Sequence, residues 1–129
     1  MSKTRRVEYK KKILIVDDKK EVADSIKRFL EYTELYSVQT IQDGEAAINL
    51  LNQKNFNLLI TDYDMPEMNG YELFKKCRAI EPELPVVFMT GDMANDRMIE
   101  NAKKEGFVGH IHKPFDIKEM IMLVGKLSR

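Results

Sequence analysis

The chain has 129 residues, with 21 basic and 21 acidic side chains, so its formal net charge is zero. Hydrophobic residues make up 43% and charged residues 33%, which is typical of one globular domain and excludes a disordered or fibrous chain. The longest apolar runs have only strand length, and no apolar stretch follows the first residues, so we expect neither a membrane span nor a secretory signal. The single cysteine, Cys77, excludes an internal disulfide and indicates a reducing, cytoplasmic setting.

The basic charge is concentrated at the N-terminus. Residues 1–12 hold six basic residues and one acid, which leaves 15 basic and 20 acidic residues in the remaining 117. A basic arm can bind nucleic acid, but no DNA-binding motif accompanies this one. We therefore interpret residues 1–11 as a solvated basic N-terminal extension and expect no direct DNA binding.

The first half of the chain predicts three strand–helix units. Apolar runs at residues 13–16, 36–41 and 56–60 are typical of strands, and uninterrupted runs indicate burial on both faces. A helix is expected after each strand, with the second beginning at Asp43-Gly44 and the third at Gly70. The side chains expected to face the core recur at helical spacing and are Val22, Ile26, Phe29, Leu30, Ala47, Leu50, Leu51, Leu73, Cys77 and Ile80.

The second half predicts two further units. A strand at residues 86–89 is followed by a helix at residues 95–104, which Gly106 would end as a C-terminal cap. A strand at residues 109–112 follows, and Asp116 would cap the last helix together with an acid three residues later. The apolar stripe expected on that helix is Ile117, Met120, Ile121, Val124 and Leu127.

Five successive β–α units imply an α/β fold with a mainly parallel sheet and helices on both of its faces. Right-handed crossover connections leave few topologies for such a chain. No linker or low-complexity segment divides residues 12–129, so we expect one domain there.

Polar residues stand where four of the predicted strands end. They are Asp17 and Asp18, Asp62, Thr90, and Lys113. Ligands of open α/β sheets bind outside the carboxyl ends of the strands, so these side chains would converge if their strands are neighbours. Clustered carboxylates repel one another unless they bind a cation, and oxygen ligands without His or Cys suit Mg²⁺ better than zinc. A carboxylate beside a metal, a Lys and a hydroxyl can accept a phosphoryl group and form an aspartyl phosphate.

Four motifs, in this order, resemble the receiver domains of bacterial response regulators over residues 12–129. The motifs are Ile13-Leu14-Ile15-Val16-Asp17-Asp18, Thr61-Asp62-Tyr63-Asp64-Met65-Pro66 with Met68-Asn69-Gly70, Met89-Thr90-Gly91, and Lys113-Pro114-Phe115. The resemblance implies a doubly wound, flavodoxin-like fold with a five-stranded parallel sheet in the order 2-1-3-4-5, flanked by five helices. It also implies a phosphoacceptor signalling domain, and not an enzyme beyond assisting its own phosphorylation and dephosphorylation.

Site roles follow from the resemblance, position by position. Asp62 would be the phosphoacceptor and a ligand of Mg²⁺. Asp17 and Asp18 would complete the acidic pocket, with Asp18 as the stronger candidate for a direct ligand, and Asp64 would offer its backbone carbonyl.

Two further roles concern the phosphoryl group. Thr90 would bind one of its oxygens and Lys113 would neutralise another. The bond between Lys113 and Pro114 resembles a cis peptide of the family that aims the lysine.

The resemblance also implies partners. A sensor histidine kinase or a histidine phosphotransfer protein would donate the phosphoryl group. A downstream protein would then contact the face formed by residues 95–104, residues 109–112 and the last helix.

The sequence departs from the family at the switch position. His110 stands where many receivers carry Tyr or Phe, so the switch pair would be Thr90 and His110. Asp64 and Asp92 occupy positions that tune the lifetime of the phosphoryl group in the family.

Two alternatives belong to other classes. Asp62-Tyr63-Asp64 also matches the Asp-x-Asp motif of haloacid-dehalogenase-type phosphatases, although those enzymes usually carry it on their first strand. A binding module with the same fold but without phosphorylation would be expected to lack Asp62, Lys113 or the acid pair, and all of these are present.

Overall fold

The computed structural model describes residues 10–91, 96–106 and 108–129, in which strands and helices alternate. The strands are β1 (Lys11–Val16), β2 (Tyr36–Ile41), β3 (Leu58–Asp62), β4 (Val86–Thr90) and β5 (Val108–His112). The helices are α2 (Lys20–Tyr32), α3 (Gly44–Gln53), α4 (Gly70–Ile80), α5 (Asp96–Lys103) and α6 (Ile117–Leu127).

The strands form one sheet in the order β2-β1-β3-β4-β5, and every neighbouring pair is parallel. This confirms the predicted fold class and strand order. Because all strands run the same way, the carboxyl ends of β1, β3, β4 and β5 meet at one edge. The chain order therefore brings residues from four distant segments to the same place.

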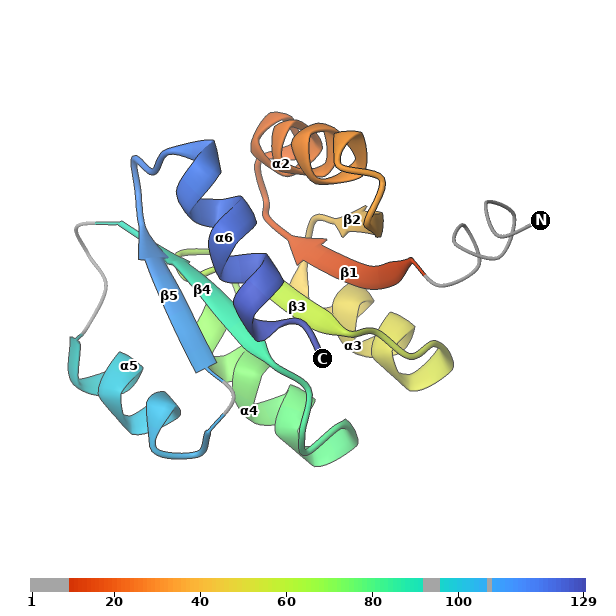
Figure 1. Ribbon diagram of the computed structural model, residues 1–129. Coiled ribbons are helices and arrows are strands. Elements are labelled where there is room, and N and C mark those ends of the chain that lie inside the picture. Colours follow the sequence, from red (N-terminus) through yellow and green to blue (C-terminus); the bar gives the residue numbers. More distant parts are fainter. Residues whose placement is uncertain (1–9, 92–95, 107) are drawn as a thin grey trace.

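Helices cover both faces of the sheet. Figure 1 shows α2 and α6 on one face and α3, α4 and α5 on the other. Each layer has its own cluster of buried side chains. In β1, Leu14 and Val16 point to the three-helix layer, whereas Ile13 and Ile15 point to the two-helix layer. This alternation explains why the strand is an unbroken apolar run.

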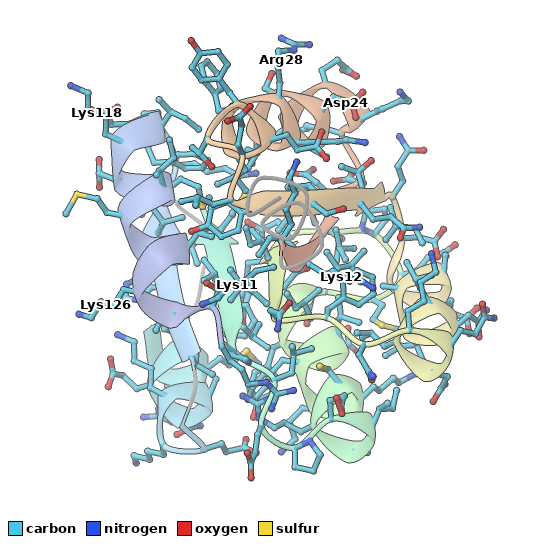
Figure 2. All side chains as sticks on the ribbon, turned by 45° about the vertical axis from the view of Figure 1, so that its right-hand side comes forward. Lys11, Lys12, Asp24, Arg28, Lys118 and Lys126 are labelled. Atoms are coloured by element: carbon cyan, nitrogen blue, oxygen red, sulfur yellow. The ribbon has the colours of Figure 1, made fainter. Side chains whose placement is uncertain are left out.

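The outer sides of the two-helix layer are charged. Asp24 and Arg28 lie on α2, and Lys118 and Lys126 lie on α6, all away from the sheet (Figure 2). In contrast, Ala23, Leu30, Met120 and Val124 on the inner sides are almost completely buried. The two helices are therefore amphipathic in the way the sequence pattern predicts.

Side chains fix the ends of several helices. Asp43 accepts a hydrogen bond from the backbone N–H of Ala46 at the start of α3. Asn69 with Glu72 and Asp116 with Glu119 form capping boxes at α4 and α6, which confirms the predicted cap at Asp116. Gly106 has φ of +80°, the left-handed conformation expected of a glycine after a helix.

Three details differ from the sequence-based expectation. Phe29 is 47% exposed, because it lies a full helical step of roughly 100° away from the buried Leu30. The third strand begins at Leu58, so the buried Phe56 packs from the preceding loop. The predicted start of the fourth helix, Asn95, lies outside the described residues.

Gly70 is required at the start of α4. A Cβ atom there would lie 2.8 Å from the backbone oxygen of Asp62 and 2.9 Å from Cα of Tyr63. We expect Gly70→Ala to lower the free energy of unfolding by about 1–3 kcal/mol, as overpacking does, measured by urea denaturation. Gly125→Ala in α6 is the control, since its Cβ would meet only Tyr36 Oη at 3.7 Å. That change should stabilise by about 0.5–1 kcal/mol, and equal effects of the two substitutions would contradict the prediction.

Within the described residues, no helix is long and apolar enough to cross a membrane.

Candidate phosphoacceptor and metal site

Three carboxylates meet at the carboxyl edge of the sheet. Asp17 and Asp18 directly follow β1, and Asp62 is the last residue of the neighbouring strand β3. One oxygen from each of the three lies within 4.8 Å of the others. Asp17 and Asp62 are buried, whereas Asp18 is exposed. The structure therefore brings together the three acids that the strand-end argument selects.

Lys113 supplies positive charge to this cluster. It follows β5, and the bond between Lys113 and Pro114 is cis. Its Nζ lies 3.1 Å from Oδ1 of Asp62 and 3.8 Å from Oδ2 of Asp17. Its backbone N–H donates to the carbonyl of Thr90 at 2.7 Å, which joins the ends of β4 and β5. One lysine thus faces two buried carboxylates.

Asp17 has an unusual environment. Its Oδ1 accepts a hydrogen bond from the backbone N–H of Lys19 at 2.9 Å, but its buried Oδ2 accepts none. The pKa of Asp17 is raised from 3.8 to about 6, and burial is the largest cause. The charges of Asp62 and Asp18 contribute to this rise, while the Lys19 N–H and Lys113 oppose it.

The raised pKa of Asp17 predicts a pH dependence of stability without metal. Between pH 4 and pH 6 the Asp17 carboxyl holds a proton in the folded state that it has released in the unfolded state. The contribution of Asp17 to the free energy of unfolding is therefore lost as the pH rises. We expect the unfolding free energy of the wild type, minus that of Asp17→Asn, to fall by roughly 2–3 kcal/mol from pH 4 to pH 7. Urea denaturation in EDTA measures this difference. A difference that stays constant or rises would contradict the prediction.

Thr90 and His110 lie on adjacent strands. Thr90 is 2% exposed, and its hydroxyl donates to the carbonyl of Ile111 in β5 at 3.3 Å. His110 is exposed and pairs in register with Phe88. The carboxyl edge therefore holds Thr90 beside the acids, while His110 lies on the surface of an edge strand.

Asp64 and Gly91 border the site. The side chain of Asp64 is exposed, and a Cβ at Gly91 would lie 3.6 Å from its Oδ2. A side chain at position 91 would therefore stand beside the Asp64 carboxylate. The predicted metal role of the Asp64 carbonyl remains a prediction, and Asp92 lies outside the described residues.

The donor set fits a hard divalent cation. Three carboxylates, without histidine or cysteine, provide the oxygen ligands that Mg²⁺ prefers. The buried Oδ2 of Asp17, which lacks a hydrogen-bond donor, is an acceptor that a cation or its bound water would satisfy. These residues could hold Mg²⁺ beside Asp62.

Sequence reasoning misses two buried polar contacts, one beside the site and one toward the other end of α4. Tyr63 is 4% exposed, and its hydroxyl donates to Sδ of Met98 in α5 at 2.8 Å. Arg78 on α4 donates to the carbonyls of Leu84 and Gly106 and thereby joins α4 to the loop after α5. These three hydrogen bonds join residues from different segments, and no local sequence pattern predicts such pairings. The available sequence signal is a polar atom at a core position.

Comparison with known proteins identifies a family and its fold. Residues 13–125 match the family described as response regulator receiver domain. The chain is 38% identical to the chemotaxis protein CheY of Pseudomonas aeruginosa over 106 residues, which are 81% of this chain and 85% of that protein. It is 35% identical to the transcriptional regulatory protein CrdR of Helicobacter pylori over 85% of this chain, but only 51% of that protein. The solved receiver domain of the Francisella response regulator 1452 has a TM-score of 0.80 and 29% identity, covering 91% of this chain and 95% of that one.

Proposed function

Because the chain belongs to the response regulator receiver domain family, we propose that it relays a signal by accepting a phosphoryl group on Asp62 with Mg²⁺ bound. Receiver domains are signalling domains rather than conventional enzymes. The observation that carries the proposal is the position of Asp62 at the end of β3, next to two other carboxylates and 3.1 Å from the Lys113 ammonium. The carboxylate of Asp62 would thus accept the phosphoryl group beside bound Mg²⁺ and the positive charge of Lys113.

The chemical step transfers a phosphoryl group from nitrogen to oxygen. The donor is a phosphohistidine on a sensor histidine kinase or a histidine phosphotransfer protein. A carboxylate oxygen of Asp62 attacks phosphorus, the phosphorus–nitrogen bond breaks, and the imidazole leaves with the electron pair and takes up a proton. Asp17, Asp18 and Asp62 would hold Mg²⁺, which when bound would supply positive charge to the phosphoryl oxygens.

The surrounding residues stabilise the transferred group. Lys113 neutralises one phosphoryl oxygen, and the Thr90 hydroxyl donates to another. To do so, Thr90 exchanges the hydrogen bond that it now makes to the Ile111 carbonyl. Because Ile111 belongs to β5, this exchange connects the phosphoryl group to the strand that carries His110.

The signal is read by a protein partner on the face formed by α5, β5 and α6. Phosphorylation shifts the population between two arrangements of that face, with Thr90 and His110 as the switch pair. The setting is the bacterial cytoplasm, with no direct DNA contact by this domain. The alternative of an Asp-x-Asp phosphatase finds no support, because the motif follows β3 and the chain belongs to the receiver family.

Incubation with acetyl phosphate and Mg²⁺ tests the proposal. We expect the intact mass to increase by one phosphoryl group, and the adduct to be removed by hydroxylamine, as an acyl phosphate is. EDTA should prevent the increase. An adduct that survives alkali and is lost in acid would place the phosphoryl group on a histidine and contradict the proposal.

A further inference from the structure

Tyr63 connects the residue after the phosphoacceptor to a helix of the proposed partner face. Its backbone is held on both sides: the N–H donates to the Met89 carbonyl and the carbonyl accepts from the Gly70 N–H, each at 2.8 Å. These bonds tie Tyr63 to β4 and to the first residue of α4. The base of the side chain is therefore fixed relative to the sheet.

The aromatic ring is fixed as well. It lies edge-on to Phe88 of β4, with ring centroids 5.7 Å apart and an interplanar angle of 82°. Its hydroxyl reaches Sδ of Met98, 35 residues later in the chain, at 2.8 Å. Burial raises the pKa of Tyr63, so the hydroxyl remains a donor at neutral pH. A thioether is a weak acceptor, and here it accepts from a buried side chain that also packs against Phe88.

The helix that carries Met98 packs on the sheet through a small apolar face. Within the described part of α5, the buried hydrophobic residues are Ile99 and Ala102. Ile99 and Ala102 also share a core cluster with Val108 of β5. A displacement of β5 when Thr90 gives up its hydrogen bond to the Ile111 carbonyl would therefore move α5 relative to the Tyr63 ring.

We infer that Tyr63 is a positioning residue that couples Asp62 to the placement of α5, by holding Met98 in the arrangement without a phosphoryl group. The inference rests on the proposed function. The contact between Tyr63 and Met98 favours the resting placement of α5, and the signalling arrangement loses it. Removing the Tyr63 hydroxyl lowers the free energy needed to displace α5 from its resting placement. By linkage, it also strengthens binding of a phosphoryl-like anion at Asp62.

The test is the affinity for beryllofluoride, an analogue of the phosphoryl group, in excess Mg²⁺. Tyr63→Phe should bind it about twofold to fivefold more tightly than the wild type, the effect of one weak hydrogen bond. The readout is the Met98 methyl resonance in protein with ¹³C-labelled methionine methyl groups, assigned with Met98→Leu. Without ligand, Tyr63→Phe should shift this resonance toward its position in the ligand-bound wild type.

Tyr36→Phe is the matched control. Tyr36 is 5% exposed, nearly the same as Tyr63, but it belongs to the core cluster of the two-helix layer. Loss of its hydroxyl should leave both the beryllofluoride affinity and the Met98 resonance unchanged. A general effect of removing a buried hydroxyl would appear in both variants.

A double-mutant cycle separates coupling from local packing. Met98→Leu, read through the remaining methionine resonances, should raise the affinity as Tyr63→Phe does, and the double substitution should add little further. Equal affinities in the wild type and both single variants, with binding still dependent on Asp62, would overturn this inference alone. Failure of the wild type to bind beryllofluoride would overturn the proposed function and this inference with it.

Discussion

Asp62→Asn should abolish the Mg²⁺-dependent incorporation of phosphate from acetyl phosphate while the protein remains folded. The amide has nearly the shape of the carboxylate but offers no anionic oxygen to attack phosphorus. The substitution also removes one of the negative charges that raise the pKa of the buried Asp17. We therefore expect the unfolding free energy to stay within about 1 kcal/mol of the wild type.

Asp43→Asn is the control, because it makes the same change from a carboxylate to an amide at a second aspartate. Asp43 is exposed and caps α3 through its side-chain oxygen, a role that asparagine also performs. Asp43→Asn should retain full incorporation, measured as the phosphorylated fraction of intact protein at matched times. Undiminished incorporation in Asp62→Asn would show that another side chain accepts the phosphoryl group.

The sequence predicts the sheet well because burial on both faces leaves a plain signal. Residues 13–16 of β1 are an apolar run, and each of them is fully buried. The start of β3 is harder to predict, since apolar residues there continue beyond the paired backbone. Phe56 is buried outside the strand, while Asn57 bonds to the backbone of Lys12 through both its backbone N–H and its side-chain oxygen. Strand pairing depends on a partner that sequence periodicity does not show.

The site is predictable to the same extent, and for a similar reason. Asp17, Asp62 and Lys113 each stand at the end of a strand, so the parallel order alone brings them together. The bond from Tyr63 to Met98 depends instead on where α5 packs. Likewise, the unsatisfied oxygen of Asp17 depends on which donors its neighbours present. Topology is sufficient to bring side chains together at one edge, but their hydrogen bonds need the packed structure.

Mg²⁺ should stabilise the folded protein against urea. Of the three clustered carboxylates, those of Asp17 and Asp62 lie beside the Lys113 ammonium, and Asp17 keeps one buried oxygen without a donor. A cation that binds only the folded state adds about 1.4 kcal/mol at ten times its dissociation constant. With a typical dependence on urea of about 1–3 kcal/mol per molar, the midpoint should rise by about 0.5–1.4 M. The measurement compares denaturation in EDTA with denaturation in millimolar Mg²⁺.

Asp18→Ala distinguishes a metal site from a general salt effect. Asp18 is exposed, so its loss removes a negative charge and the expected cation ligand without opening the core. Asp24→Ala, which removes an acid paired with Lys20 on α2, should keep the full Mg²⁺ increment. An equal increment in Asp18→Ala would argue against a cation site at Asp18.

The order of stabilities gives the sharper result. Without metal, Asp18→Ala should be at least as stable as the wild type, because the charge of Asp18 raises the pKa of Asp17 and so opposes its ionisation. With Mg²⁺ the order should reverse, because the wild type keeps a ligand that the variant has lost. Loss of an ordinary structural contact would lower stability in both conditions alike. Only a residue that repels its neighbours without a cation, and shares the cation with them when it is bound, produces the reversal.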